Sequence, residues 1–216
     1  MFAEEVPPIT PVNFFQMSLE CRALPSGEFP RITAKNRKKY ALPVTAHLCD
    51  EYPFAELSMG WSADGIEIFA HVKKQFEDAR YPDVQNGDSV ELLIDTRDVK
   101  SIGFNNRFCH HFVFLPKAVG GVQAHEITRF RTEDTHEICD PHQLETLTQF
   151  YSNHYTLQMY IPSECLFGYE PEQFQRIGFT YRINRPEEEA QHFSVCSDEY
   201  RIDQQPALWS SVRLVL

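Results

Sequence analysis

The sequence contains no apolar run long enough to cross a lipid bilayer, so it predicts no membrane-spanning helix. Residues 1–8 carry neither the basic stretch nor the apolar segment that a secretory signal needs. Positive charge is also scarce, because 20 Lys and Arg stand against 31 Asp and Glu and give a formal net charge of −11. Such an acidic chain repels phosphate backbones and anionic lipid surfaces. We therefore expect a cytoplasmic protein that binds neither nucleic acid nor membrane.

Motifs that carry enzyme chemistry are absent as well. The sequence has no Gly-x-Ser-x-Gly nucleophile elbow, no phosphate-binding loop, no His-Glu-x-x-His pair and no dinucleotide fingerprint. Two of the 31 acidic residues could in principle form a glycoside-hydrolysing pair, but sequence does not place two carboxylates at the required separation. We expect a protein that is not an enzyme.

The cysteines are scattered, and no two of them form a Cys-x-x-Cys pair. In a reducing compartment this predicts free thiols, several of them buried in strands, whereas export of the protein would allow disulfides. The six positions are Cys21, Cys49, Cys109, Cys139, Cys165 and Cys196.

Helical periodicity is missing from nearly the whole chain, and aromatic residues are abundant. The 17 Phe and 9 Tyr favour pleated strands, and nine or ten segments with alternating apolar residues are separated by polar turns. This pattern predicts an all-β protein, an antiparallel two-sheet β-sandwich that resembles a jelly roll. The expected strands cover residues 12–21, 41–48, 54–61, 66–72, 88–95, 108–115, 122–131, 151–161, 176–183 and 208–215.

Prolines are concentrated near the start of the chain, where five of the 14 lie within residues 1–30. Proline fixes φ and removes an N–H donor, so this region is expected to form an extended arm. Neither an internal repeat nor a low-complexity linker divides the chain. We expect a single domain over residues 1–216, in which residues 1–44 supply the arm and the first strands and residues 45–216 form the core.

The most informative segment is residues 87–95, where a turn signal opens directly into a strand. Because side chains alternate along a strand, Val90, Leu92 and Ile94 share one face and Glu91 lies on the other. A carboxylate in the middle of a strand is costly to bury unless something pairs with it. Glu91 therefore either binds a ligand on a working face of the sheet or pairs with a cation or donor on a neighbouring strand.

The order of several short motifs points to a known family. Trp61 is followed by the Asp64-Gly65 hairpin turn and then by the strand Asp88-Ser-Val-Glu-Leu-Leu-Ile-Asp95. Much later come Ile177-Gly-Phe-Thr-Tyr-Arg-Ile-Asn184 and Pro206-Ala-Leu-Trp-Ser-Ser-Val-Arg-Leu214. This arrangement resembles the β-sandwiches of carbohydrate-binding module family 9, which are similar in fold to DOMON domains.

The resemblance covers residues 45–216 and implies non-catalytic binding of a glycan or sugar end in a concave face or at a loop rim. In that family, aromatic rings stack on the sugar and charged side chains bind its hydroxyl groups. The strand after the acidic motif usually carries an arginine, whereas residues 108–115 contain none. On this basis the expected ligand-binding residues are Trp61, Tyr81, Glu91, Phe104, Arg107 and His111.

The missing arginine supports an alternative, in which the fold serves as a protein-interaction or structural module that has lost its sugar site. The partner is then a protein and not a carbohydrate.

A metal site has only weak support in the sequence, and we expect no cofactor. His136, Cys139 and His142 have ligand spacing, but Asp140-Pro141 would break a helix that presented them. A metal-dependent enzyme that uses these His and Cys residues is thus the third hypothesis for function. The family resemblance also implies calcium sites, for which the candidates Asp88, Asp95 and Asp98 lack the spacing of a calcium loop.

Overall fold

The protein is described here by a computed structural model that covers residues 17–196 and 200–216. The described residues form eleven strands and short 3₁₀ turns, with no α-helix among them, which confirms the all-β prediction. The strands are β1 (Ser18–Ala23), β2 (Ala55–Ser62), β3 (Gly65–Val72), β4 (Ser89–Asp95), β5 (Cys109–Val119), β6 (Val122–Glu126), β7 (Glu145–Phe150), β8 (Tyr155–Pro162), β9 (Arg176–Asn184), β10 (Gln191–His192) and β11 (Ser210–Val215). The 3₁₀ turns are η2 (Arg37–Tyr40), η3 (Ala46–Leu48), η4 (Val84–Asn86), η5 (Pro141–Gln143), η6 (Ser163–Cys165), η7 (Ile202–Gln204) and η8 (Pro206–Leu208).

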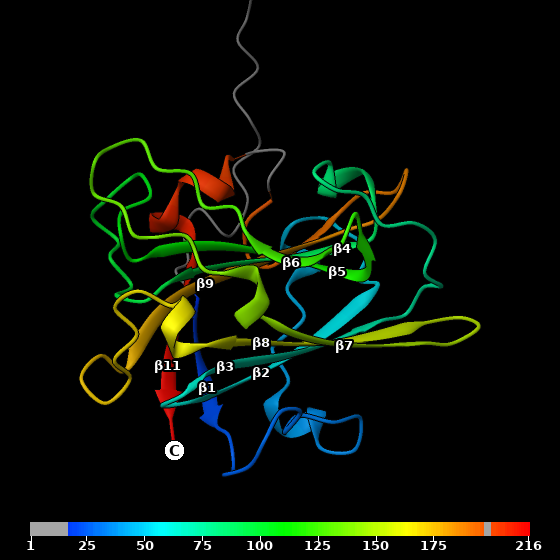
Figure 1. The fold of residues 1–216 in the computed structure, drawn as a ribbon, viewed down its shortest axis with the longest axis horizontal. Coiled ribbons are helices and arrows are strands. Elements are labelled where there is room, and N and C mark those ends of the chain that lie inside the picture. The colour runs from blue at the N-terminus through cyan, green and yellow to red at the C-terminus, as the bar shows by residue number, and fades with distance from the viewer. Residues whose placement is uncertain (1–16, 197–199) are drawn as a thin grey trace, which may run out of the picture.

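The strands form one hydrogen-bonded path that folds over on itself. Its order is β6-β5-β4-β9-β11-β1-β2-β3-β8-β7, and β10 pairs with β9 outside this path. Strands β6, β5, β4 and β9 make one layer, and β2, β3, β8 and β7 make the other (Figure 1). The two ends of the path, β6 and β7, contact each other, so the sandwich is close to a barrel.

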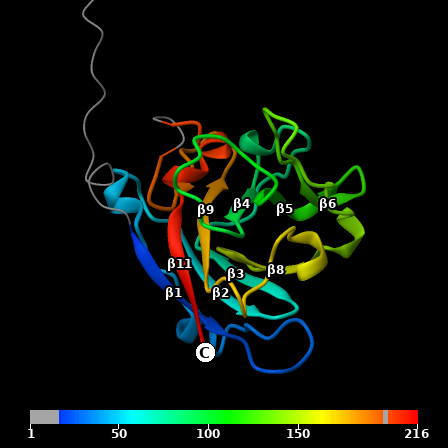
Figure 2. The ribbon, with the colours of Figure 1, turned by 90° about the vertical axis from the view of Figure 1, so that its left-hand side faces the viewer.

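Strand β1 joins the two layers, and it is the exception to the antiparallel pattern. It runs parallel to β11, with Cys21 opposite Leu214, and parallel to β2, with Arg22 opposite Gly60. Figure 2 shows β1 and β11 side by side. Antiparallel pairing follows from short hairpin turns, and neither neighbour of β1 is connected to it by one. The sequence pattern could not reveal this, because the three strands lie far apart in the chain.

The main core lies between the two layers and is built by the alternation that the sequence predicts. Val90, Leu92 and Ile94 of β4 are fully buried in it. Ile66 and Ile68 of β3 pack into the same core from the opposite layer. Burial of each such side chain contributes about 1.5–3 kcal/mol. The opposite face of β4 is therefore turned away from the core, and it carries Glu91.

Several predicted segments differ from the observed elements. Residues 41–48 form an isolated bridge at Ala41 and a 3₁₀ turn in place of a strand. The strand predicted over 122–131 ends at Glu126. Strand β7 forms between the strands predicted over 122–131 and 151–161, where no strand was expected. Strand β7 is an edge strand whose side chains are mostly exposed or half-buried, so it needs no run of apolar residues.

The β5–β6 hairpin is also longer than predicted. Strand β5 continues through Pro116 to Val119, and the chain turns only at Gly120-Gly121. Proline lacks an N–H donor, and the strand tolerates it here because the β5–β6 pairing is irregular between Phe114 and Val119. Both turn glycines have positive φ, a conformation that glycine adopts without steric cost.

Two other predictions concern the chain ends and the membrane. The predicted proline-rich arm falls largely on residues 1–16, which lie outside the described residues; the described part begins just before β1. Within the described residues, no helix is long and apolar enough to span a membrane.

The prediction of free thiols is wrong for one cysteine pair. Cys139 and Cys165 form a disulfide that links the segment before η5 to η6. The two positions are 26 residues apart in sequence and lie on different connections, so no local pattern pairs them. Cys21 and Cys109 are buried thiols, and burial raises the pKa of Cys109 to about 12.

We expect the Cys139–Cys165 disulfide to stabilise the fold by about 3.5 kcal/mol, the chain-entropy estimate for a loop of roughly 26 residues. The double variant Cys139→Ala/Cys165→Ala should lose this amount in urea unfolding monitored by tryptophan fluorescence. Reductant should destabilise the wild type and leave the double variant unchanged. A non-reducing digest in which Cys139 and Cys165 occur only in separate peptides would contradict the pairing.

Candidate functional site

A pocket of 290 Å³ lies over the outer face of the β4–β5–β9 layer, on the side of β4 that faces away from the main core. Its floor is made by Glu91 of β4, His111 of β5 and Arg182 of β9. Residues 82–85, which include part of η4, form one wall. The rest of the lining is Ile127, Arg129 and Asp203.

Strand register brings the three floor residues together. Glu91 is directly opposite Arg182 across the β4–β9 ladder. His111 is opposite Leu93 on the β4–β5 ladder, two residues along from Glu91 and therefore on the same face. Asn184, two residues after Arg182, lies on this face as well. The alternation that buries the apolar face of each strand thus sets four polar side chains side by side on the outer face.

Hydrogen bonds to the Glu91 carboxylate use both of its oxygens. The Arg182 guanidinium binds it in a bidentate manner, with Nε 2.8 Å from Oε1 and Nη2 2.8 Å from Oε2. His111 Nε2 lies 2.8 Å from Oε2, and Asn184 Nδ2 donates to Oε1 at 2.6 Å. These four contacts fill the acceptor capacity of a carboxylate, which is about four sites. Of the two roles open to Glu91, the structure shows pairing with neighbouring strands.

Glu91 is ionised at neutral pH although it is fully buried. Burial is the largest single influence and opposes ionisation, but hydrogen bonds and charge from His111 and Arg182 together hold the pKa of Glu91 well below its usual range. A buried ion pair of this kind contributes little net stability, yet removing one partner leaves an uncompensated charge. Glu91 therefore fixes the positions of Arg182 and His111.

The pocket offers a donor and an acceptor that Glu91 does not occupy. Arg182 Nη1 and His111 Nδ1 have no hydrogen-bond partner among the described residues, and neither atom is a buried orphan. Arg129 is exposed and makes no ion pair within the described part of the chain. Asp83 and Asp203 add acceptors, each of which already binds a nearby amide. This mixture of donors and acceptors suits a polar, hydroxyl-rich ligand.

The pocket lining contains no Phe, Tyr or Trp side chain. Tyr81 precedes the wall residue Pro82, and its hydroxyl is hydrogen-bonded to His125 of β6. Phe104 is 38% exposed on the loop between β4 and β5. The next residue, Asn105, donates to the backbone oxygens of Arg129 and Asp203 and so holds the pocket rim.

Of the six residues predicted to bind ligand, the structure brings two into the pocket, Glu91 and His111. Tyr81 and Phe104 belong to segments that adjoin its lining, as described above. Arg107 forms an exposed ion pair with Asp134, and the indole N–H of Trp61 donates to Val215 O at 3.0 Å. Neither side chain lines the pocket.

Arg182 and Asn184 of β9 were not among the predicted ligand-binding residues. The strand was predicted from its apolar positions 177, 179, 181 and 183, and the polar residues between them were not considered. Arg182 and Asn184 occupy two of those intervening positions. Glu91 likewise lies between the apolar positions of its own strand. The available signal was that both strands carry polar residues on the face opposite their apolar positions, because such residues can pair across neighbouring strands.

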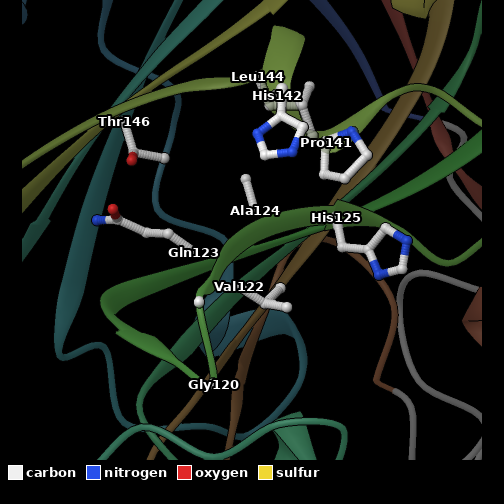
Figure 3. A pocket seen from close by; sticks show the side chains of 10 residues that line it. Gly120, Val122, Gln123, Ala124, His125, Pro141, His142, Leu144 and Thr146 are labelled. Atoms are coloured by element: carbon white, nitrogen blue, oxygen red, sulfur yellow. The ribbon is translucent and has the colours of Figure 1, made fainter.

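The residues considered for a metal site are not brought together as predicted. His136 lies against Glu126, and Cys139 is in the disulfide with Cys165. His142 lines a different pocket of 390 Å³, which lies between β6, η5 and β7 (Figure 3). That pocket has no carboxylate, guanidinium or ammonium group in its lining.

The three aspartates considered for calcium are each held by other contacts. Asp88 binds Arg185, and Asp95 accepts the backbone N–H groups of the loop that follows β4. Asp98 forms an ion pair with Lys100. Calcium takes six to eight oxygen ligands, and these carboxylates do not offer a shared set.

Comparison with solved structures supports the fold prediction. A family 9 carbohydrate-binding module from Caldicellulosiruptor kristjanssonii in complex with cellotriose matches with a TM-score of 0.61 at 13% identity, covering 92% of this chain and 93% of that one. The same organism's family 9 module in complex with glucose matches with a TM-score of 0.64 at 11% identity, covering 92% and 96%. A putative carbohydrate-binding protein from Bacteroides uniformis matches with a TM-score of 0.57 at 8% identity, covering 93% and 100%.

The chain therefore has a fold like that of family 9 carbohydrate-binding modules, and at these identities the likeness concerns the fold alone. The named matches do not include a DOMON domain, so that part of the resemblance stays a prediction. No family model matches the sequence, and no curated protein matches it either.

We expect Glu91→Gln to destabilise the protein by about 3–5 kcal/mol, because it leaves the buried Arg182 guanidinium without its counter-charge. The measurement is the free energy of unfolding in urea. Glu56→Gln is the matched control, since Glu56 is 36% exposed and pairs with Arg37 and Lys73 on the surface. That variant should lose less than about 1 kcal/mol. Equal losses in the two variants would contradict the role given to Glu91.

The low pKa of Glu91 also predicts a pH dependence. Because the folded-state pKa lies below the unfolded value of about 4.3, the stabilisation is fully present above that pH and is lost as the pH falls towards the folded-state pKa. The unfolding free energy of the wild type should therefore drop between about pH 4.5 and pH 2. The slope should be shallower in Glu91→Gln. Identical slopes in both proteins would show that folding does not shift the pKa of Glu91.

Proposed function

We propose that this chain is a non-catalytic carbohydrate-binding module and that its ligand site is the pocket over Glu91, His111 and Arg182. The observation that carries the proposal is the saturated Glu91 carboxylate, which holds the Arg182 and His111 side chains rigidly at the pocket floor. The likeness in fold to modules that bind cellotriose and glucose supports the same class of ligand.

The proposed binding mode uses hydrogen bonds more than stacking. Arg182 Nη1 donates to a sugar hydroxyl from the floor, and His111 Nδ1 accepts a hydrogen bond from one because Nε2 carries the N–H that donates to Glu91. Arg129 and Asp203 contact the ligand from the rim. Glu91 is a positioning residue, because its own acceptor sites are filled. A volume of 290 Å³ is at the lower end of the range for small-molecule pockets and suits one sugar ring at a chain end. Without an aromatic platform, we expect a dissociation constant of about 1 mM.

A second candidate function is a protein-interaction module, and the absence of a Phe, Tyr or Trp side chain from the pocket lining favours it. In that case the same polar pocket receives a side chain or loop of another protein. Site-specific photocross-linkers at Gln85 and Arg129 should then label one partner in the native cell, whereas a cross-linker at Arg176, outside the lining, should not.

The carbohydrate proposal is tested by titrating the protein with glucose and with cellotriose while recording backbone amide chemical shifts. Saturable shifts should occur around β4, β5, β9 and residues 82–85. Arg129→Ala should weaken binding about fivefold, the effect of losing a hydrogen bond worth about 1 kcal/mol. Arg176→Ala is the matched control, because Arg176 is an exposed arginine of β9 outside the pocket and its loss should change nothing.

Two results would refute this proposal. One is the absence of any saturable shift at sugar concentrations well above the millimolar range. The other is saturable binding that Arg129→Ala and Arg176→Ala weaken equally.

A further inference from the structure

Three chemically reactive side chains meet on the opposite face of β5 from the pocket. His110 of β5 and Glu126 of β6 are fully buried, and His136, from the segment that follows β6, has a side chain only 1% exposed. Because His110 and His111 are consecutive in a strand, they point to opposite sides of the sheet. This cluster of His110, Glu126 and His136 is therefore separate from the proposed sugar site. One ligand atom from each residue lies within 4.8 Å of the others.

The hydrogen bonds of His136 do not balance for a neutral imidazole. Its Nδ1 lies 2.8 Å from the backbone oxygen of Arg107, and its Nε2 lies 2.7 Å from Glu126 Oε1. A carbonyl oxygen and a carboxylate oxygen are both acceptors, while a neutral imidazole carries one N–H. When Nδ1 donates to Arg107, the lone pair of Nε2 faces the carboxylate oxygen. A cation must lie between them, either a second proton or a metal ion.

The surroundings of Glu126 orient it for this purpose. His110 Nδ1 lies 2.9 Å from the same oxygen, Oε1, and the Thr128 hydroxyl donates to it at 2.7 Å. The backbone N–H of Cys139 donates to the other oxygen, Oε2, at 2.8 Å. Nε2 of His110 has no geometrically suitable partner, although the atom is buried. The carboxylate is thus held in place while two imidazole nitrogens converge on one of its oxygens.

We propose that His110, Glu126 and His136 bind a divalent transition-metal ion, for which zinc is the best match. Two imidazoles and a carboxylate are a ligand set that zinc uses in proteins. The contact from His136 Nδ1 to the Arg107 carbonyl is the outer contact that a metal-bound histidine normally makes with its second nitrogen. In tetrahedral geometry, zinc bonds of about 2.0–2.2 Å place any two ligand atoms about 3.4 Å apart. The two imidazole nitrogens now lie 2.9 and 2.7 Å from Glu126 Oε1. The carboxylate and rings need to move apart by roughly half an ångström to reach the tetrahedral separation.

The role of the ion would be structural. The three side chains are almost fully buried, so a substrate does not reach the site from solvent, and an enclosed water molecule would fill the fourth zinc position. The ion links β5 and β6 to the segment that contains Cys139, whose disulfide with Cys165 continues the connection to η6. Metal and disulfide would together fix a stretch of chain that has little regular secondary structure.

The test uses the untagged full chain, stripped with chelator and titrated with zinc sulfate by calorimetry. We expect one equivalent to bind, a rise in the melting temperature, and release of a proton that is measurable in buffers of different ionisation enthalpy. His136→Gln should weaken zinc binding at least tenfold. His142→Gln is the matched control, because His142 lies six residues away and lines the pocket of Figure 3. That variant should bind zinc as the wild type does.

If His136→Gln does not fold, two measurements on the wild-type protein still test the proposal: cobalt absorption spectroscopy and ¹⁵N NMR of the histidine rings. Cobalt should give the visible absorption of a tetrahedral site in the wild type. Zinc should shift His110 Nδ1 and His136 Nε2 in long-range ¹H–¹⁵N spectra. The proposal fails if zinc binds equally to the wild type and His136→Gln, or if it leaves these nitrogens unshifted. An imidazolium at His136 that persists in excess zinc would show that the cation is a shared proton only.

Discussion

The buried charge of Glu91 is the constraint on which the outer face of this sandwich depends. A carboxylate in that position must be compensated, and the neighbouring strands supply a bidentate arginine, an imidazole and an amide. Because all acceptor sites of Glu91 are filled, its partners cannot move independently. The result is a polar floor with fixed geometry on a sheet whose other face packs mainly on the hydrophobic core. Polar groups that are held rigidly lose little entropy when a ligand binds to them.

The consecutive residues His110 and His111 of β5 contact different glutamates on the two faces of the sheet. His111 faces the pocket and contacts Glu91, whereas His110 faces the interior and contacts Glu126. Each histidine meets a glutamate, but the two environments differ. The first glutamate is paired with an arginine, whereas the second is held by two imidazoles, a hydroxyl and a backbone N–H. In both cases these contacts hold the pKa of the carboxyl well below its usual range. Strand alternation alone produces this division.

Local sequence patterns were sufficient for the parts of the fold that depend on local rules. Strand β4 and the β2–β3 hairpin were predicted with nearly their observed bounds, because turn residues and alternation specify them. Glu91 was recognised as a residue that needs a partner for the same reason. Its partner Arg182 was not found, since the two residues are 91 positions apart and only the register of β4 against β9 joins them.

The remaining errors have the same origin in non-local contacts. The Cys139–Cys165 pair and the parallel pairing of β1 join distant segments, and no local spacing encodes either of them. Strand β7 was missed because an edge strand is selected by hydrogen bonds to its neighbour and not by burial of its side chains. In this fold, then, local alternation determines which residues face inward, and long-range register determines which of them meet.

The position of β1 has a consequence for the order in which the protein can assemble. This strand fills the seam between β2 and β11, and β11 is translated after every other strand. During synthesis on the ribosome, one edge of β1 therefore stays without its hydrogen-bonding partner until translation has passed residue 215. The two layers cannot be joined into one continuous sheet before that moment. A nascent chain must protect this open edge from pairing with other chains until β11 has been made.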